Sequence, residues 1–246
     1  MAERASFRII AIALLALAMT ACRKQNPDAE ILLFDGTGAS RGSVSALEDI
    51  LDRHHLEYAT VDSSSLNSMS EANLRRHRLL IVPGGNFIEM GKSLSPDTAA
   101  RVRNSVEAGL NYLGICAGAL LAGDTPFNGF NLTSGVKFPF YSASNSGIRK
   151  TVVAVRGADG KILDQYWEDG PQLAGWGQIV SKYPDGMPAT VQSRLGLGAI
   201  ILTGIHAEAN EKWRGGMTFN TSVEEDNAYA SLLIQSALSR SALPHF

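Results

Sequence analysis

The feature that most constrains the fold is an alternation of short apolar runs with segments of helical periodicity over residues 30–123. The apolar runs have the length and composition of buried strands, and Gly, Pro or Asp ends several of them. Between them, apolar residues recur at three- and four-residue spacing, as Val44, Leu47 and Leu51 do. The expected strands are EILLFDG, LEYATVDS, RLLIVPGG and LNYLGIC. This order predicts an α/β fold, a parallel sheet with helices on both faces.

Cap residues support the expected helices. Ser70 is placed to cap a short helix over SEANLRRH. Ser95, followed by Pro96, opens the segment SPDTAARVRNSVEAG, and Gly109 closes it. A further helix is expected to begin at AGALLAG, directly after the fourth strand.

The second half of the chain is rich in short strand-like pieces. We expect strands in SGVKFPFYSAS, KTVVAVRG, KILDQYWEDG, GQIVSKY, PATVQSR and GLGAIILTGIHAEA, and a closing helix in DNAYASLLIQSALSR. Residues 157–161, GADGK, are predicted to form a hairpin turn. Without an internal repeat, a single domain over 30–246 with a β-rich second half accounts for the pattern.

The N-terminus is typical of an export signal. Two arginines precede eleven apolar residues, 9–19, which as a helix rise only about 16 Å against a bilayer core of about 30 Å. The exit Met19-Thr20-Ala21-Cys22 is similar to a bacterial lipoprotein box, with Met19 in place of the usual Leu. We expect a signal over 1–22, lipidation at Cys22, a polar tether over 23–29, and a periplasmic protein anchored through its lipid; ordinary signal-peptidase cleavage is the alternative.

Charge gives no indication of a nucleic-acid partner. The formal net charge is −2, and the densest basic cluster, residues 75–78, has the character of a solvated helix end. The chain has two cysteines, so acylation of Cys22 would leave Cys116 as the lone thiol. A lone thiol in an oxidising compartment is either well buried or functional, and burial carries about even weight.

The sequence around Cys116 favours a nucleophile. Gly114-Ile115-Cys116-Ala117-Gly118 joins an expected strand to an expected helix, with glycines where a tight turn needs small neighbours. This turn would place the sulfur at a helix N-terminus, where the dipole favours a thiolate. It would also offer the Ala117 N–H to a developing oxyanion. Packing alone can also explain such glycines.

A base for this nucleophile is expected at His206. Among five histidines, only His206 follows a long apolar strand that should end at the same sheet edge, and Glu208 lies two residues further on. A lone histidine in this place is more often structural, but Cys, His and Glu together favour a triad. No third ligand stands at a metal-binding spacing, so we expect no metal and no other cofactor.

These motifs resemble the class I glutamine amidotransferase-like superfamily, and most closely the amidotransferase-like N-terminal domain of biotin-protein ligases. FDGTGAS, IVPGGNF, GICAGALLAG and GIHAEA carry the likeness, over roughly residues 30–240. The resemblance implies a flavodoxin-like sheet and a Cys116-His206-Glu208 triad. It also implies oxyanion and pocket groups at Gly84, Gly85, Asn86 and Ala117, and a pocket wall at Gly36 and Gly38.

Two departures bear on the substrate. Glutaminases carry Gln four residues after the cysteine, where this chain has Leu120, and the residue between His and Glu is Ala207 in place of Pro. The nucleotide loop of biotin ligases is missing from the sequence. We therefore expect a cysteine hydrolase of small amides or esters, without biotin ligation. The alternatives are a non-catalytic binding module on the same fold and a redox-sensing thiol.

Overall fold

The computed structural model describes residues 28–142 and 146–246, so the signal, most of the tether and Cys22 lie outside the described part. Within it, one nine-stranded sheet runs in the order β2-β1-β3-β4-β9-β8-β7-β5-β6. Its strands are β1 (Ile31–Phe34), β2 (Tyr58–Val61), β3 (Leu79–Val82), β4 (Asn111–Ile115), β5 (Lys150–Gly157), β6 (Ile162–Glu168), β7 (Gln178–Lys182), β8 (Pro188–Leu195) and β9 (Gly198–Thr203).

The first five strands in that order pair in parallel, with β9 included through its pairing with β4. The remaining neighbours pair antiparallel, from β9 with β8 to β5 with β6. The α/β class with a parallel sheet and a β-rich second half is therefore confirmed.

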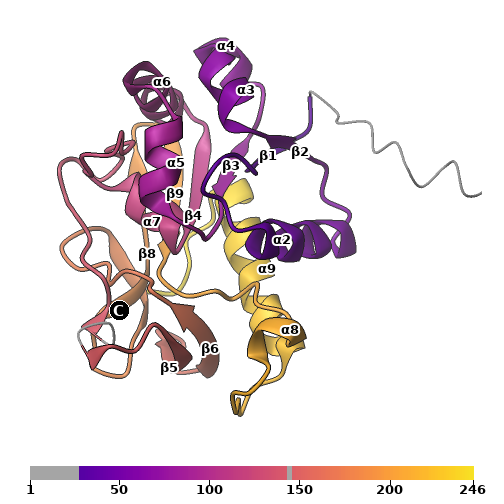
Figure 1. The fold of residues 1–246 in the computed structure, drawn as a ribbon, viewed down its shortest axis with the longest axis vertical. Coiled ribbons are helices and arrows are strands. Elements are labelled where there is room, and N and C mark those ends of the chain that lie inside the picture. The colour runs from indigo at the N-terminus through magenta and orange to yellow at the C-terminus, as the bar shows by residue number, and fades with distance from the viewer. Residues whose placement is uncertain (1–27, 143–145) are drawn as a thin grey trace, which may run out of the picture.

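Helices cover both faces of the parallel part, as Figure 1 shows with α2 and α9 on one side and α5, α6 and α7 on the other. The helices are α2 (Arg41–Arg53), α3 (Ser63–Ser68), α4 (Glu71–Leu74), α5 (Phe87–Ser93), α6 (Pro96–Glu107), α7 (Ala117–Ala122), α8 (Glu211–Arg214) and α9 (Val223–Ser239). Ser70 and Ser95 cap α4 and α6 as expected, each accepting a backbone N–H three residues on.

Alternation along the strands builds two cores. In β1, Leu32 and Phe34 pack with α3, α5 and α6, whereas Ile31 and Leu33 pack with α2 and α9. Successive side chains of a strand point to opposite faces, so a strand that is apolar throughout is buried on both sides. Every residue of β1, β3, β4 and β9 is buried.

The antiparallel half follows the expected strands with one exception. Residues 157–161 form the turn between β5 and β6, with the Gly157 N–H donating to the Lys161 carbonyl at 2.8 Å. The strand expected over residues 134–144 is wrong: its described part holds one isolated bridge, Phe140 to Pro171. Pro139 has no N–H for a ladder, and the buried Phe138 and Tyr141 produce the apolar alternation by packing into the core.

Candidate active site

Cys116 stands at a strained turn between β4 and α7. Its backbone has φ 49° and ψ −103°, a conformation that a non-glycine residue rarely adopts. Glycines allow the close approach on either side, because a Cβ on Gly118 would clash with the Val82 carbonyl and one on Gly114 would contact the Gly118 backbone. The expected turn geometry is therefore present, and it puts Cys116 at the N-terminus of α7.

The sheet order brings His206 to this turn. The Cys116 N–H donates to the carbonyl of Thr203, the last residue of β9, at 2.8 Å. Three residues later, His206 donates its own N–H to the Tyr166 carbonyl at 2.9 Å. Because β4 and β9 are neighbours, the residues that follow them meet at one sheet edge.

The side chains form a directed chain of hydrogen bonds. Nδ1 of His206 lies 2.8 Å from Oε1 of Glu208, and the Ser43 hydroxyl donates to the same oxygen at 2.7 Å. Ser43 in turn accepts the Gly84 N–H at 3.1 Å. The carboxylate thus holds the imidazole by Nδ1, which leaves Nε2 for a proton transfer. Sequence reasoning missed Ser43, since a serine in the first turn of a helix carries no signal of its own.

The electrostatics favour a charged imidazole. Burial by itself would lower the pKa of His206, but the charges of Glu208 and Cys116 and their hydrogen bonds outweigh it and hold that pKa well above its ordinary value. Oε2 of Glu208 has no hydrogen-bond partner in the described part of the chain. The neighbouring imidazole is therefore the group that compensates this buried carboxylate.

The thiol contacts a carbonyl from the β-rich half. Sγ of Cys116 lies 3.3 Å from the Glu168 carbonyl oxygen, to which it donates. Tyr166 donates its hydroxyl to Oε2 of Glu168 at 2.8 Å, and burial raises the pKa of Tyr166 far above its usual range. The segment YWEDGP, residues 166–171, thus contributes one wall of the site.

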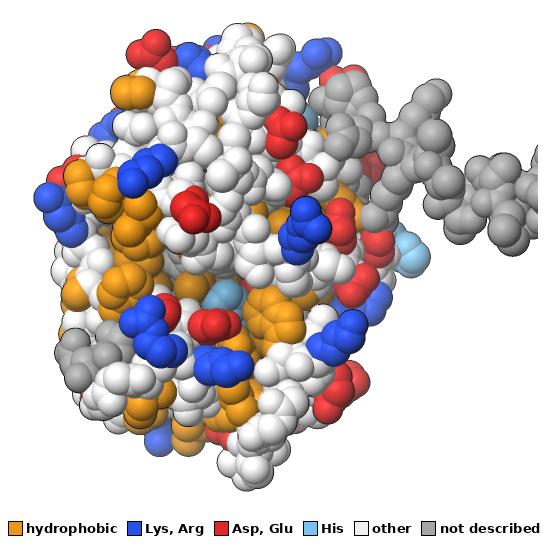
Figure 2. Space-filling view, viewed as in Figure 1, with side chains coloured by type: hydrophobic (Ala, Val, Ile, Leu, Met, Phe, Trp, Pro, Cys, Tyr) orange, Lys and Arg blue, Asp and Glu red, His pale blue; other side chains and the backbone are white. Residues whose placement is uncertain are grey.

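Two aromatic rings and a glycine enclose His206. Tyr166 and Trp213 meet the imidazole edge to face, with centroid distances of 5.8 and 5.4 Å. On another side a Cβ at Gly84 would clash with Cε1 of His206. His206 and Cys116 are each only 4% exposed, so access to the reactive atoms is narrow. On the face that Figure 2 shows, hydrophobic side chains lie next to Lys, Arg, Asp and Glu side chains.

Two backbone N–H groups are candidate oxyanion donors. In the described part of the chain, the N–H groups of Gly85 and Ala117 have no hydrogen-bond acceptor. Gly118 donates to the Pro83 carbonyl at 3.2 Å, which ties the start of α7 to the turn that carries Gly85. The Gly84 N–H is engaged by Ser43, so it is not available for this role.

The other expected pocket residues support this turn. The Asn86 side chain caps α5 by accepting the N–H groups of Ile88 and Glu89. Gly38, with φ 87°, accepts the Asn86 N–H at 2.8 Å. Gly36 packs closely against Ser63, at the start of α3. Gly36 and Gly38 thus border the loop beside the site, and their contacts are with backbone and with α3 and α5.

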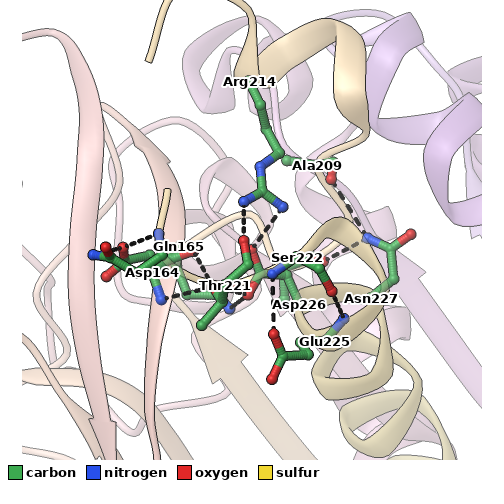
Figure 3. A network of polar contacts seen from close by, with 11 residues as sticks. Asp164, Gln165, Ala209, Arg214, Thr221, Ser222, Glu225, Asp226 and Asn227 are labelled. Carbon is green, nitrogen blue, oxygen red and sulfur yellow. Dashed lines mark hydrogen bonds and ion pairs between the residues drawn. The ribbon is translucent and has the colours of Figure 1, made fainter. Parts of the chain in front are cut away.

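A polar network holds the segment after His206 in place (Figure 3). Asn227, in the first turns of α9, donates to the Ala207 and Ala209 carbonyls at 3.1 and 3.4 Å. Beside it, Asp226 accepts Gln165 of β6 at 2.9 Å and pairs with Arg214. Burial raises the pKa of Asp226 to about 6. The network joins β6, α8 and α9 around the backbone that carries Glu208.

Comparisons with known proteins bear on the family and the fold. Residues 29–128 match the family model described as biotin-protein ligase, N terminal. The match covers 100 of the 246 residues, and over that part the chain is similar to the biotin-protein ligase N-terminal family. A search of curated proteins returns no match.

Comparison with solved structures shows what fold this chain shares. A glutamine amidotransferase is similar at 18% identity, TM-score 0.58, over 85% of this chain and 98% of its own. A GMP synthase component from Thermoplasma acidophilum is similar at 14% identity, TM-score 0.50, over 86% of this chain and 96% of its own.

The same fold also occurs in proteins of other kinds. A GH42 beta-galactosidase is similar at 11% identity, TM-score 0.52, over 85% of this chain and 30% of its own. At such identities the likeness shows the fold, and function must be argued from the site. Among the described residues, no group of three or more His, Cys, Asp or Glu side chains is placed to hold a metal, and no helix is long and apolar enough to span a membrane.

Proposed function

We propose that this protein is an amidotransferase-like cysteine hydrolase that acts on a small amide or ester through Cys116, His206 and Glu208. The observation that carries the proposal is the buried His206–Glu208 pair at the end of β9, beside a cysteine held in a strained turn at the end of β4. Structural residues seldom combine a cysteine at positive φ with an oriented, charged imidazole.

The proposed reaction has two steps, acylation of Cys116 and hydrolysis of the thioester. The Cys116 thiol gives its proton to Nε2 of His206, and the sulfur adds to the carbonyl carbon. The oxyanion that forms accepts the Gly85 and Ala117 N–H groups. The C–N or C–O bond then breaks, and His206 protonates the departing amine or alcohol, leaving a thioester. Water then adds to the thioester carbonyl and passes a proton to His206. The C–S bond breaks, the acid leaves, and His206 returns the proton to the sulfur, which restores the thiol.

Glu208 and Ser43 serve this cycle by holding the imidazole. Glu208 fixes Nδ1 as the donor and stabilises the imidazolium. Ser43 fixes the carboxylate through the same oxygen. The proposal also includes export and anchoring through a lipid on Cys22, which rest on the N-terminal sequence alone. The proposed substrate is a small molecule, and a nucleic-acid partner is not part of the proposal.

The decisive experiment is the alkylation rate of Cys116 against pH, read at its peptide by mass spectrometry. A raised His206 pKa keeps the imidazolium charged above its ordinary range, and in the proposed pair this charge beside the sulfur stabilises the thiolate. Rapid labelling is therefore expected at a pH of about 6–7, below the ordinary thiol pKa of about 8.5. In His206→Ala the rate should rise only near that ordinary value. Glu208→Gln removes a charge that raises the His206 pKa, so its profile should fall between the two.

A non-catalytic binding module is the second candidate, because Cys116 and His206 are both almost closed off from solvent. An inert buried thiol predicts slow labelling that is unaffected by His206→Ala. That result would exclude the catalytic triad and would favour a binding role on the same fold.

A further inference from the structure

A pocket of about 260 Å³ lies near the proposed active site, and neither Cys116 nor His206 is among the residues that line it. Its walls are mainly aromatic and apolar: Phe87, Leu120, Phe127, Phe138, Pro139 and Phe140. Phe87 is central, since its ring packs edge to face on Phe127 at 6.0 Å and on Phe140 at 6.3 Å between centroids. Phe140 is 43% exposed and stands at the opening.

Each wall belongs to a segment that also forms the active site. Leu120 is one helical turn from Cys116 along α7, a rise of about 6 Å. Phe87 opens α5 two residues after Gly85. Pro139 accepts the Gln172 N–H at 3.0 Å, and Tyr141 donates to Gly170 at 2.9 Å, just beyond the Glu168 carbonyl that contacts the thiol. Through Leu120, whose N–H donates to the Cys116 carbonyl at 3.1 Å, the pocket lies one helical turn from the residue that carries the reacting sulfur.

The pocket lies away from the side where the leaving group departs. His206 protonates that group in the proposed cycle, and its walls are Tyr166, Trp213 and Gly84. None of these three residues lines the pocket. Because Leu120, one of its walls, lies one helical turn beyond Cys116, the pocket suits the acyl part of the substrate better than the leaving group.

The lining cannot satisfy a polar acyl chain. Its charged members, Asp124 and Lys137, pair with each other at 3.7 Å at the exposed rim, and the Thr125 hydroxyl accepts the Phe127 N–H. A carboxamide or an amino-acid head group placed among the phenylalanines would lose its hydration without gaining partners. An apolar group gains by leaving water.

We infer that the hydrolase selects substrates with an apolar acyl group, a phenylacetyl group or an alkyl chain of about four to six carbons, and does not accept glutamine. This specificity rests on the proposed function of Cys116. The size follows from the volume, since an engineered apolar cavity of about 150 Å³ already holds benzene. Leu120 and Phe140 are the residues that determine it.

The test uses full-length protein and 4-nitrophenyl esters of acetate, butyrate, hexanoate and phenylacetate, which share one leaving group. We expect kcat/KM to rise at least tenfold from acetate to hexanoate or phenylacetate, with no ammonia released from L-glutamine. Phe140→Ala, at a half-exposed position that the fold tolerates, should lower the preference for the larger acyl groups several-fold. Leu120→Gln should do the same. The matched control is Leu232→Ala, an exposed leucine in a different pocket, which should leave the series unchanged.

The outcomes separate this inference from the proposed function. Rapid Cys116 labelling with a flat ester series, or turnover of glutamine, overturns the acyl specificity and leaves the hydrolase. Ester cleavage that survives Cys116→Ser contradicts the hydrolase itself. Where no ester is cleaved, phenylacetate and acetate are compared at equal concentration as protectants of Cys116 against alkylation, and equal protection overturns the inference.

Discussion

At the scale of single residues, the site depends on the absence of a side chain at Gly84. Gly84 leaves room for the imidazole of His206, and a Cβ there would clash with Cε1. Its N–H also completes the hydrogen-bond chain through Ser43 to Glu208. The position of His206, the proposed general base, is therefore set partly by the turn that follows β3.

Gly84→Ala should displace His206 and slow Cys116 labelling below neutral pH about a hundredfold, because a base moved by about 1 Å loses its alignment with the thiol. The measurement is the labelling rate at the Cys116 peptide, with far-ultraviolet circular dichroism as a check on folding. Gly215→Ala is the control: its φ is −52° and the nearest atom to a new Cβ lies at 3.4 Å. Equal rates in the two variants would contradict the role of Gly84.

The candidate site residues that the sequence indicates share one property, which is their place after a strand. Cys116, His206 and Glu208 follow strands, and their backbone context marks them in the sequence. Ser43, Tyr166 and Trp213 come from helices or from mid-strand, and only the packing of distant segments brings them to the imidazole. No local pattern carries that information.

At the scale of elements, α9 contacts the loop that carries the proposed base, His206, and Glu208. Asn227 binds the carbonyls on either side of Glu208, and Arg53 of α2 donates to Oδ1 of Asn227 at 2.8 Å. Two helices that cover one face of the sheet thus clamp the segment that follows β9. Asn227 touches neither the thiol nor the imidazole in this arrangement, so its role is positioning.

Asn227→Ala should cost about 1–3 kcal/mol of stability, since it leaves buried carbonyls without partners. It should also shift the pH profile of Cys116 labelling toward that of His206→Ala. A matched control is Asn67→Ala, which breaks bonds to Ser93, Ser95 and Thr98 near α3 and α6. That variant should lose similar stability in urea titrations and keep the wild-type profile. If Asn227→Ala and Asn67→Ala both keep the wild-type pH profile of Cys116 labelling, the positioning role of Asn227 is wrong.

Element prediction succeeded where burial on both faces gave continuous apolar runs, and it failed over residues 134–144. There the aromatic residues form a wall of the pocket that we assign to the acyl group, and among the described residues Phe140 forms one isolated bridge, to Pro171. The order of β5 to β8 was likewise beyond sequence reasoning, because antiparallel pairing partners depend on tertiary packing. In particular, β7 lies between β5 and β8.

At the scale of the whole molecule, the proposed lipid anchor at the N-terminus and the proposed hydrolase activity of the domain can be tested separately. A lipid at Cys22 would leave only residues 23–29 before the domain, a reach of at most about 25 Å when fully extended. The domain would then work at the membrane surface. Its substrate would be collected there or delivered from the periplasm, and an apolar acyl group suits either route.

Cys22→Ser should release the protein from the membrane fraction into the soluble periplasmic fraction, because the acyl chains supply the binding energy of such an anchor. The other cysteine gives the matched control: Cys116→Ser should stay with the membrane and lose only the labelling. Intact mass should show the lipid on wild type and on Cys116→Ser. A wild-type mass without lipid, or membrane retention of Cys22→Ser, would contradict the anchor. Because the described domain begins beyond Cys22, either result leaves the triad to be judged by the chemistry of Cys116 alone.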